Sequence, residues 1–272
     1  MPIVTITRGS LSASRQLAES ICGQLGCTVV TREHVLECAR AYGIEETGMA
    51  ASGFMEKHPP QFWDRQAAQR RLYLIYVRAC LLHYMTTGNV VYIGHLAQFM
   101  LTAVPKMLRV RVDASMALRV QILIESSSLS ESQAKEHIAD IDAKRRSWAK
   151  FLYGVDYDSP LNYDIILNRD RMSVDSLAAI VSAVVQRPEF VVDDDALTTI
   201  KNLHMAAVVS AHLARDIRTR GMELAVDCDA ASGLTKIRGM STLVGGDTWQ
   251  QDIKRVAAEA PGVTSIEVTD VR

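Results

Sequence analysis

The sequence predicts an α/β protein, in which a parallel β-sheet carries helices on both faces and a small α+β layer follows. The first observation is that short, continuous apolar runs alternate with helical patterns up to Pro188. Strands buried on both faces have such runs, whereas half-exposed strands alternate apolar and polar residues. The second is the order helix, strand, strand, helix, strand after Pro188. The third is the length of 272 residues, which suits two domains. We therefore predict domains at 1–189 and 190–272.

Five segments of the first domain have the pattern of buried strands. They are residues 3–7, 27–30, 89–94, 108–112 and 163–168. Helical patterns occur at 70–87, at 130–150 and from Ser173 to about residue 186. Ser130 and Ser173 each precede a helix, where a serine accepts a hydrogen bond from a free N–H group of the first turn. Strands that alternate with helices in this way favour a parallel sheet.

Near the start of the second domain, residues 193–195 form a polar break. A long helix is predicted over 196–220, closed by Gly221. Strands at 222–227 and 235–240, a helix at 247–259 and a strand at 266–271 complete the pattern. A layer of this size and order is able to fold alone.

Composition excludes several classes of function. The net charge of −1 leaves no overall field that would attract nucleic acid or an anionic membrane. No apolar run reaches the roughly 18 residues that a membrane span needs. The five cysteines have no CxxC spacing and no signal peptide precedes them, so they are interpreted as reduced thiols, mostly in the core. We expect a cytoplasmic protein without nucleic-acid or membrane partners.

The connection after the first strand has the layout of a phosphate-binding loop. Such loops use glycines because several N–H groups must turn toward one anion, a lysine for the terminal phosphates, and a hydroxyl for magnesium. The segment from Thr7 to Ala18 reads Thr-Arg-Gly-Ser-Leu-Ser-Ala-Ser-Arg-Gln-Leu-Ala. It resembles the loop of the cytidylate kinase-like family, which has the form Ser-Arg-x-x-Gly-Ser-Gly-Gly-Arg-Glu-Ile-Ala.

This resemblance is incomplete at the positions that matter for phosphate. Arg8, Ser12 and Arg15 match the family, whereas Leu11, Ala13 and Ser14 replace its glycines. Against an ordinary nucleoside monophosphate kinase loop, Ser14 stands at the lysine and Arg15 at the magnesium-holding hydroxyl. One interpretation is a plain strand-to-helix connection without a ligand. The other is an anion site at the helix N-terminus, formed by Arg8, Ser12, Ser14 and Arg15. In either case ATP and Mg²⁺, the cofactors that the resemblance implies, are placed in doubt.

The resemblance extends over about residues 1–187. It is carried by the segments 31–35, 90–95, 107–113, 130–138, 142–148 and 153–168, which include Tyr-Asp-Ile-Ile-Leu-Asn at 163–168. It implies a three-layer P-loop kinase-like fold for this part of the chain.

The resemblance also assigns roles to individual residues. It implies that Arg119 and Arg145 hold the transferred phosphoryl group and that Asp142 orients Arg145. It further implies that Arg32 and His95 contact the acceptor substrate. The alternatives stay open. The charged residues of 142–146 also fit a solvated helix face, and Arg32 fits a surface ion pair. His95 replaces an arginine and fits a buried structural histidine, because imidazole lacks the guanidinium fork.

The C-terminal part resembles a BON domain in its order of elements and in the segment Ala-Pro-Gly-Val-Thr-Ser-Ile-Glu-Val at 260–268. BON domains are associated with membrane or phospholipid contact and with partner binding. No basic patch for lipid stands out here, so membrane contact is not expected. The resemblance implies a ligand-sensing or oligomerisation module, and a homo-oligomer stays open.

Three functional hypotheses follow. The leading one is a kinase-fold protein that binds a nucleotide or another phosphorylated small molecule in a regulatory role, with weak or no phosphotransfer. The second is an active ATP-dependent (d)CMP or nucleoside monophosphate kinase. The third is a non-catalytic scaffold that binds a partner protein.

Overall fold

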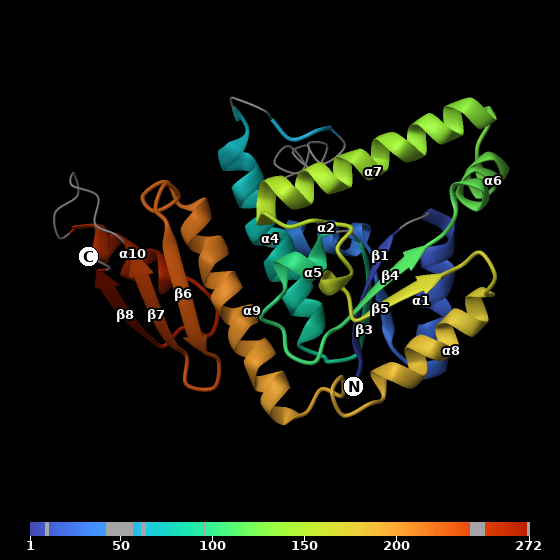
Figure 1. Ribbon diagram of the computed structural model, residues 1–272. Helices are drawn as coiled ribbons and strands as arrows, with labels where there is room; N and C mark the ends of the chain where they lie inside the picture. Colours follow the sequence, from blue (N-terminus) through green and yellow to red (C-terminus); the bar gives the residue numbers. More distant parts are fainter. Residues whose placement is uncertain (9–10, 42–56, 61–63, 95, 240–247, 271–272) are drawn as a thin grey trace. The chain divides into compact units, whose positions relative to one another are not determined.

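The computed structural model describes residues 1–8, 11–41, 57–60, 64–94, 96–239 and 248–270; at 8, 11–13 and 41 it describes the backbone alone (Figure 1). The chain divides into two compact units. The first consists of Met1–Val35, Ala50–Asp64 and Gly88–Val192, and the second of Leu36–Met49, Arg65–Thr87 and Asp193–Arg272.

The first unit contains the predicted parallel sheet. Its strands are β1 (Ile3–Arg8), β2 (Thr28–Val30), β3 (Val90–Gly94), β4 (Leu108–Asp113) and β5 (Ile165–Asn168). The strand order is β2-β3-β1-β4-β5, and every neighbouring pair is parallel. The central strand is β1, in which Thr7 is in register with Gly94 on one side and Arg111 on the other.

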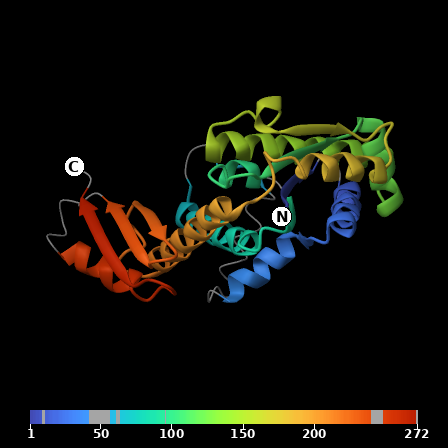
Figure 2. The ribbon, with the colours of Figure 1, turned by 90° about the horizontal axis from the view of Figure 1, so that it is seen from below.

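Helices cover both faces of this sheet, which confirms the predicted fold class (Figures 1 and 2). Among the described residues of the first unit, the helices are α1 (Leu11–Leu25), α5 (Ala97–Met100), α6 (Met116–Ser126), α7 (Glu131–Tyr153), the 3-10 turn η2 (Pro160–Asn162) and α8 (Val174–Val185). A further helix, α2 (Arg32–Ala41), begins in the first unit and continues in the second.

The main core of the first unit lies between one face of the sheet and the helices α1 and α8. Alternate strand residues point into it, and the helices contribute residues spaced three or four apart. Its fully buried members include Val4, Ile6, Leu17, Ile21, Val91, Leu108, Val110, Leu177 and Val181. The even-numbered residues of β4 face this core, so the odd-numbered ones face the other side of the sheet.

The starts of two helices follow the capping residues that the sequence predicts, Ser130 and Ser173. At the start of α7, Ser130 Oγ accepts a hydrogen bond from Gln133 N, and the Gln133 side chain accepts one from Ser130 N. The helix ends at Gly154, whose φ of 68° is in the left-handed region. Ser173 caps α8 in the same way through the N–H of Ser176. These caps fix where α7 begins and where the segment after it leaves the helix.

The second unit has the predicted order of elements. Helix α9 (Asp194–Arg215) is followed by β6 (Leu224–Asp229), β7 (Leu234–Gly239), α10 (Thr248–Ala257) and β8 (Ser265–Asp270). The sheet order is β6-β7-β8, with β6 antiparallel and β8 parallel to β7. Its core contains the apolar side chains Val209, Leu213, Ile237, Trp249, Ile253 and Val256.

Two features of the second unit differ from the sequence analysis. Helix α9 ends at Arg215 instead of near residue 220, because Asp216 has an extended ψ of 134° and Thr219 Oγ1 donates to Leu213 O. The unit also includes α4 (Ala67–Met85), which packs against α9 although it lies far earlier in the chain. The boundary near residue 190, with domains at 1–189 and 190–272, stays a prediction. None of the described helices combines the length and apolar character needed to cross a bilayer.

Candidate functional site

The phosphate-loop positions lie at the start of a helix. Strand β1 ends at Arg8 and α1 begins at Leu11, so positions 11, 13 and 14 belong to the first turn of α1. Helical backbone has a negative φ and does not require glycine, and leucine and alanine favour it. Leu11 and Ala13 are therefore compatible with the helical backbone of this turn.

Of the two side chains described here, one is buried and the other forms an ion pair. Ser14, at the lysine position, has 0% of its surface exposed. Arg15, at the hydroxyl position, is 73% exposed, and its Nε lies 3.0 Å from Glu19 Oε1 one turn further along α1. The side chains of Arg8 and Ser12 lie outside the described residues, as does His95. Arg32 is half-buried at the start of α2.

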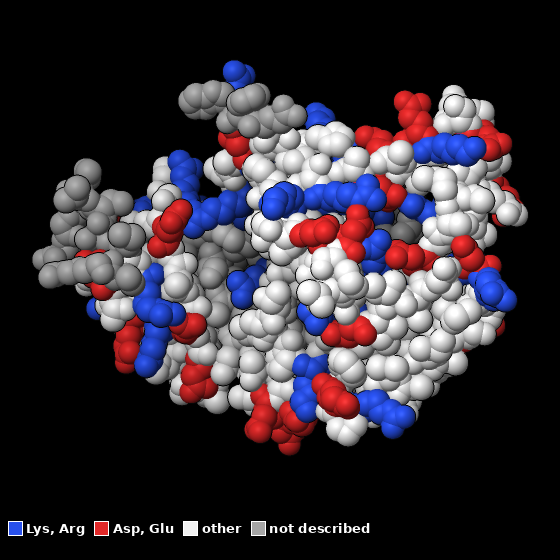
Figure 3. All heavy atoms as spheres, in the orientation of Figure 1, with Lys and Arg blue, Asp and Glu red and all other residues white. Residues whose placement is uncertain are grey.

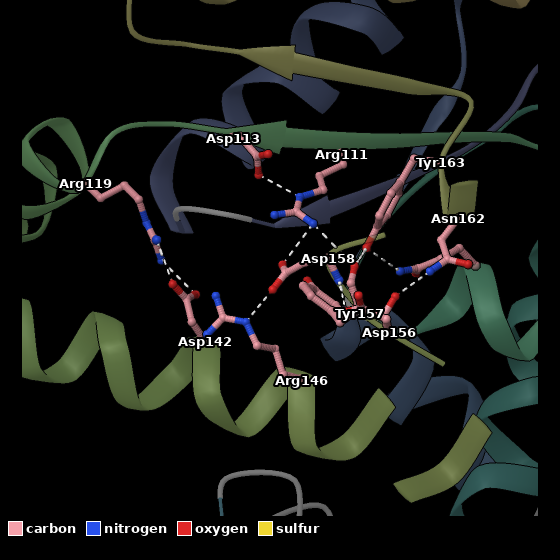
Figure 4. A network of polar contacts seen from close by, with 11 residues as sticks. Arg111, Asp113, Arg119, Asp142, Arg146, Asp156, Tyr157, Asp158, Asn162 and Tyr163 are labelled. Atoms are coloured by element: carbon pink, nitrogen blue, oxygen red, sulfur yellow. Dashed lines mark hydrogen bonds and ion pairs between the residues drawn. The ribbon is translucent and has the colours of Figure 1, made fainter. Parts of the chain in front are cut away.

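A cavity of about 270 Å³ lies at the carboxyl end of β4 (Figure 4). In open parallel sheets, ligands bind outside this edge of the strands. The lining residues come from β4 and the turn after it, from α6, from α7 and from the segment that follows α7. They are Arg111, Asp113, Ala114, Arg119, Asp142, Arg146, Tyr157 and Asp158.

Two of the predicted site residues, Arg119 and Asp142, meet in this cavity. Arg119 comes from α6 and Asp142 from α7, and their side chains form a two-pronged ion pair. Arg119 Nη1 lies 2.7 Å from Asp142 Oδ2, and Nη2 lies 2.9 Å from Oδ1. The Arg119 side chain is 13% exposed and that of Asp142 is 20% exposed. The pair is thus partly shielded from water, which strengthens its attraction.

Arg111 connects the other acidic groups of the cavity. Its Nε lies 2.7 Å from Asp113 Oδ1 and its Nη1 lies 3.0 Å from Asp158 Oδ1. Its guanidinium also lies 5.7 Å from the ring centre of Tyr157 and 5.5 Å from that of Tyr163, within the range of a cation–π contact. Burial lowers the pKa of Arg111, but its carboxylate partners outweigh burial and raise the pKa above its ordinary value.

Arg146 completes the network from α7 by pairing with the second oxygen of Asp158. Burial raises the pKa of Asp158, but the hydrogen bond and charge of Arg146 and the charge of Arg111 outweigh it and lower the pKa overall. Asp158 therefore stays ionised and bridges two arginines from different elements. It is held in place by its own backbone, since Asp158 N donates to Asp156 Oδ1 at 3.0 Å.

The lining is charge-balanced. It holds three guanidinium groups, from Arg111, Arg119 and Arg146, and three carboxylates, from Asp113, Asp142 and Asp158. Each guanidinium already contacts a carboxylate. Acidic side chains also lie among the basic ones on the face shown in Figure 3. An anionic ligand in this cavity would have to compete with the aspartates for the arginines.

Sequence reasoning found part of this lining and missed the rest. Arg145 lies on α7 and is 8% exposed, but it is not among the lining residues, and its predicted bond with Asp142 stays a prediction. Arg111, Asp113 and Asp158 were not identified as site residues. The available signal was the alternation Leu-Arg-Val-Arg-Val-Asp at 108–113, which places charged residues on one face of a strand in the middle of a sheet.

Similarity to known proteins covers the part of the chain that forms this sheet and cavity. The sequence profile of the cytidylate kinase-like family matches residues 3–171. A relative, the cytidylate kinase of Pyrococcus horikoshii, is 28% identical over 144 residues, which cover 52% of this chain and 68% of that protein. The crystal structure of an uncharacterized protein from Eubacterium ventriosum matches with a TM-score of 0.50 and 17% identity, over 68% of this chain and 97% of that one. This last likeness concerns the fold alone.

Proposed function

Because this chain belongs to the cytidylate kinase-like family, we propose that it binds a nucleotide or another phosphorylated small molecule in a regulatory role, with weak or no phosphotransfer. The observation that carries this proposal is the arginine-lined cavity at the carboxyl end of β4. Guanidinium groups are planar forks that match phosphate oxygens, and three of them converge here. In this proposal Arg111, Arg119 and Arg146 hold the ligand's phosphate in competition with the lining aspartates, and Arg145 stays a predicted phosphate contact.

The loop supports the part of the proposal that concerns weak transfer. In a phosphotransferase of this type, Mg²⁺ would neutralise the charge on the ATP phosphates. The residues at the corresponding positions do not fit that ion, because Ser14 is fully buried and Arg15 is an exposed cation paired with Glu19. Among the described residues, no group of three or more His, Cys, Asp or Glu side chains is arranged to hold a metal. Arg8, Ser12, Ser14 and Arg15 stay a predicted anion-binding set.

The second candidate is an active ATP-dependent (d)CMP kinase, which the identity to a cytidylate kinase favours. In that case Arg32 and His95 would contact the acceptor nucleotide. A coupled assay for ADP release with a panel of nucleoside monophosphates separates the two candidates. Turnover on the order of 1–100 per second would reject the proposal of weak transfer.

Calorimetric titration tests the binding proposal directly. ATP, CMP and inorganic phosphate are titrated with and without Mg²⁺, and we expect at least one nucleotide to bind with a Kd on the order of 1 µM to 1 mM. Arg119→Ala should weaken that binding at least tenfold. The matched control is Lys135→Gln, which removes one positive charge from α7 at an exposed pair with Glu131. If no nucleotide binds, or if Arg119→Ala and Arg145→Ala leave every measured property intact, the scaffold hypothesis replaces the proposal.

The second unit is the other part of the proposal, as a BON-like module for ligand sensing or oligomerisation. Its support is the order helix, strand, strand, helix, strand over residues 194–270. The turn before β8 is also tightly built, because Gly262 has a φ of 84° and a Cβ on Gly233 would lie 2.6 Å from Gly262 O. Light scattering of the full chain with and without nucleotide tests the oligomerisation role. A constant mass under both conditions would leave sensing as the remaining role.

A further inference from the structure

The end of helix α1 brings two cysteines into contact. Cys22 Sγ and Cys27 Sγ lie 2.6 Å apart. This is closer than the roughly 3.5–4.0 Å of ordinary non-bonded contacts between heavy atoms. Neither the family resemblance nor the cavity of the first unit gives these two residues a role.

The backbone conformation of the turn at Gly26 brings these two cysteines together. Gly26 has a φ of 65° and its N–H donates to Cys22 O at 2.8 Å, while the N–H of Cys27 donates to the same oxygen at 3.3 Å. This is the pattern of a glycine-capped helix end, in which the side chain one residue beyond the glycine packs against the side chain four residues before it. In this chain both of those side chains are thiols.

The turn that carries the two cysteines is also anchored to the sheet. Asn89 Nδ2 donates to Gly26 O at 2.8 Å, and Thr28 N donates to Asn89 O at 3.1 Å. Asn89 directly precedes β3, and Thr28 is the first residue of β2. The thiols are therefore held together by hydrogen bonds on both sides of the turn, which lowers the entropic cost of linking them.

We propose that Cys22 and Cys27 are a dithiol site that is reversibly oxidised to a disulfide by low-molecular-weight disulfides such as oxidised glutathione. This site is independent of the proposed nucleotide function.

The two thiols have different access and different acidity. Cys27 is half-buried, whereas Cys22 is 8% exposed. The hydrogen bond between them lowers the pKa of Cys27 against the opposing effect of burial, and it raises the pKa of Cys22 together with burial. Cys27 is thus the attacking thiol and Cys22 the resolving one, because the thiolate is the nucleophile in disulfide exchange.

The exchange has two balanced steps. The Cys27 thiolate attacks one sulfur of oxidised glutathione, breaks its S–S bond and releases one glutathione thiolate, which takes up a proton. Cys22 then loses its proton and attacks the Cys27 sulfur, forming the internal disulfide and releasing the second glutathione. Two protein thiols are oxidised, and one glutathione disulfide is reduced to two thiols.

The remaining cysteines provide internal comparisons. Cys38 and Cys80 also hydrogen-bond through their thiols, but Cys80 is 0% exposed in the middle of α4. Cys228 contacts Thr235 Oγ1 at 3.4 Å and not another thiol. We expect the Cys22–Cys27 pair to oxidise before the Cys38–Cys80 pair, and Cys228 to form no internal disulfide.

Peptide mapping of the full-length protein tests this inference. The protein is equilibrated with reduced and oxidised glutathione at several ratios, quenched in acid, alkylated and digested with trypsin. Cleavage after arginine and lysine leaves Cys22 and Cys27 together on peptide 16–32, and leaves the others apart on 33–40, 79–106 and 221–236. The expected result is that peptide 16–32 loses two hydrogen atoms and escapes alkylation, at ratios where peptide 221–236 is still fully alkylated.

Single variants separate the internal disulfide from unspecific oxidation. Cys22→Ser should trap a stable mixed disulfide of glutathione on Cys27, whereas Cys27→Ser should leave the buried Cys22 alkylated only after unfolding. Cys228→Ser is the matched control and should leave the oxidation of peptide 16–32 unchanged. Circular dichroism checks that each variant is folded. Full alkylation of both cysteines on peptide 16–32 of the wild-type chain at every ratio would overturn the proposal, as would glutathione adducts in place of the internal disulfide.

Discussion

The substitution Asp142→Asn probes the balance of charge in the cavity. It keeps the shape of the side chain but removes one of the three lining carboxylates, so that the lining gains one net positive charge. Arg119, whose two nitrogens contact Asp142 at 2.7 and 2.9 Å, would then be available to an anionic ligand. At an effective dielectric constant of about 20, unit charges about 6 Å apart interact by about 2.8 kcal/mol. Water and salt reduce this, and we expect about 1 kcal/mol, or a Kd for a phosphorylated ligand about fivefold lower.

Calorimetric titration of CMP and ATP at two salt concentrations measures this change. The expected gain in affinity is larger at low salt, because the added attraction is electrostatic. The matched control is Asp227→Asn in the second unit, which changes the net charge equally at an exposed pair with Arg238. The reasoning is refuted if Asp142→Asn weakens binding while the control does not. Asp142 would then position Arg119 for the ligand instead of competing with it.

Three further outcomes are expected for the first unit. Tyr157→Phe removes a buried hydroxyl that has no hydrogen-bond partner among the described residues. Urea unfolding should therefore show a free energy of unfolding that is unchanged or raised by up to about 1 kcal/mol. A decrease of more than about 1 kcal/mol would contradict the view that this hydroxyl is unpaired. Gly94→Ala would place a Cβ 2.3 Å from Tyr92 Oη and should cost about 1–3 kcal/mol in the same assay, with partial recovery in the double variant that adds Tyr92→Val. The pKa of Asp158 is lowered overall in the folded state, so this residue stabilises the fold above its unfolded pKa of about 3.9, and the effect is lost as pH falls through the lower folded pKa. Asp158→Asn should therefore flatten the acid side of the plot of unfolding free energy against pH. An unchanged plot would contradict the pairing with Arg146.

The sheet could be predicted from the sequence because the residues that indicate each strand and each helix end are close together in the chain. Strands β2, β3 and β5 are short and mainly apolar, and the caps of α7 and α8 are single serines next to helical patterns, at Ser130 and Ser173. The start of α1 at Leu11 follows from the same kind of signal, because leucine and alanine at positions 11 and 13 favour helical backbone.

The cavity could not be predicted in the same way because its partners are distant in the sequence. Asp158 meets Arg111 across 47 positions of chain, and Asp142 meets Arg119 across 23. Which carboxylate pairs with which guanidinium depends on how α6, α7 and the segment after α7 pack together. No periodicity within a single element encodes that choice. The ion pair of Asp142 with Arg119 joins two different helices in this way, and the bond between Asp142 and Arg145 stays a prediction.

The register of β4 against β1 has a consequence for how this protein tolerates change. Arg111 is beside Thr7, whereas its neighbours Val110 and Val112 point into the core between the sheet and α1. A deletion or insertion of a single residue within β4 would exchange the side chains on the two faces of the strand. Valines would then face the cavity, and arginines would face the apolar core. Length changes are thus expected to be selected against inside this strand, while point substitutions that keep its alternation are free to retune the chemistry of the cavity.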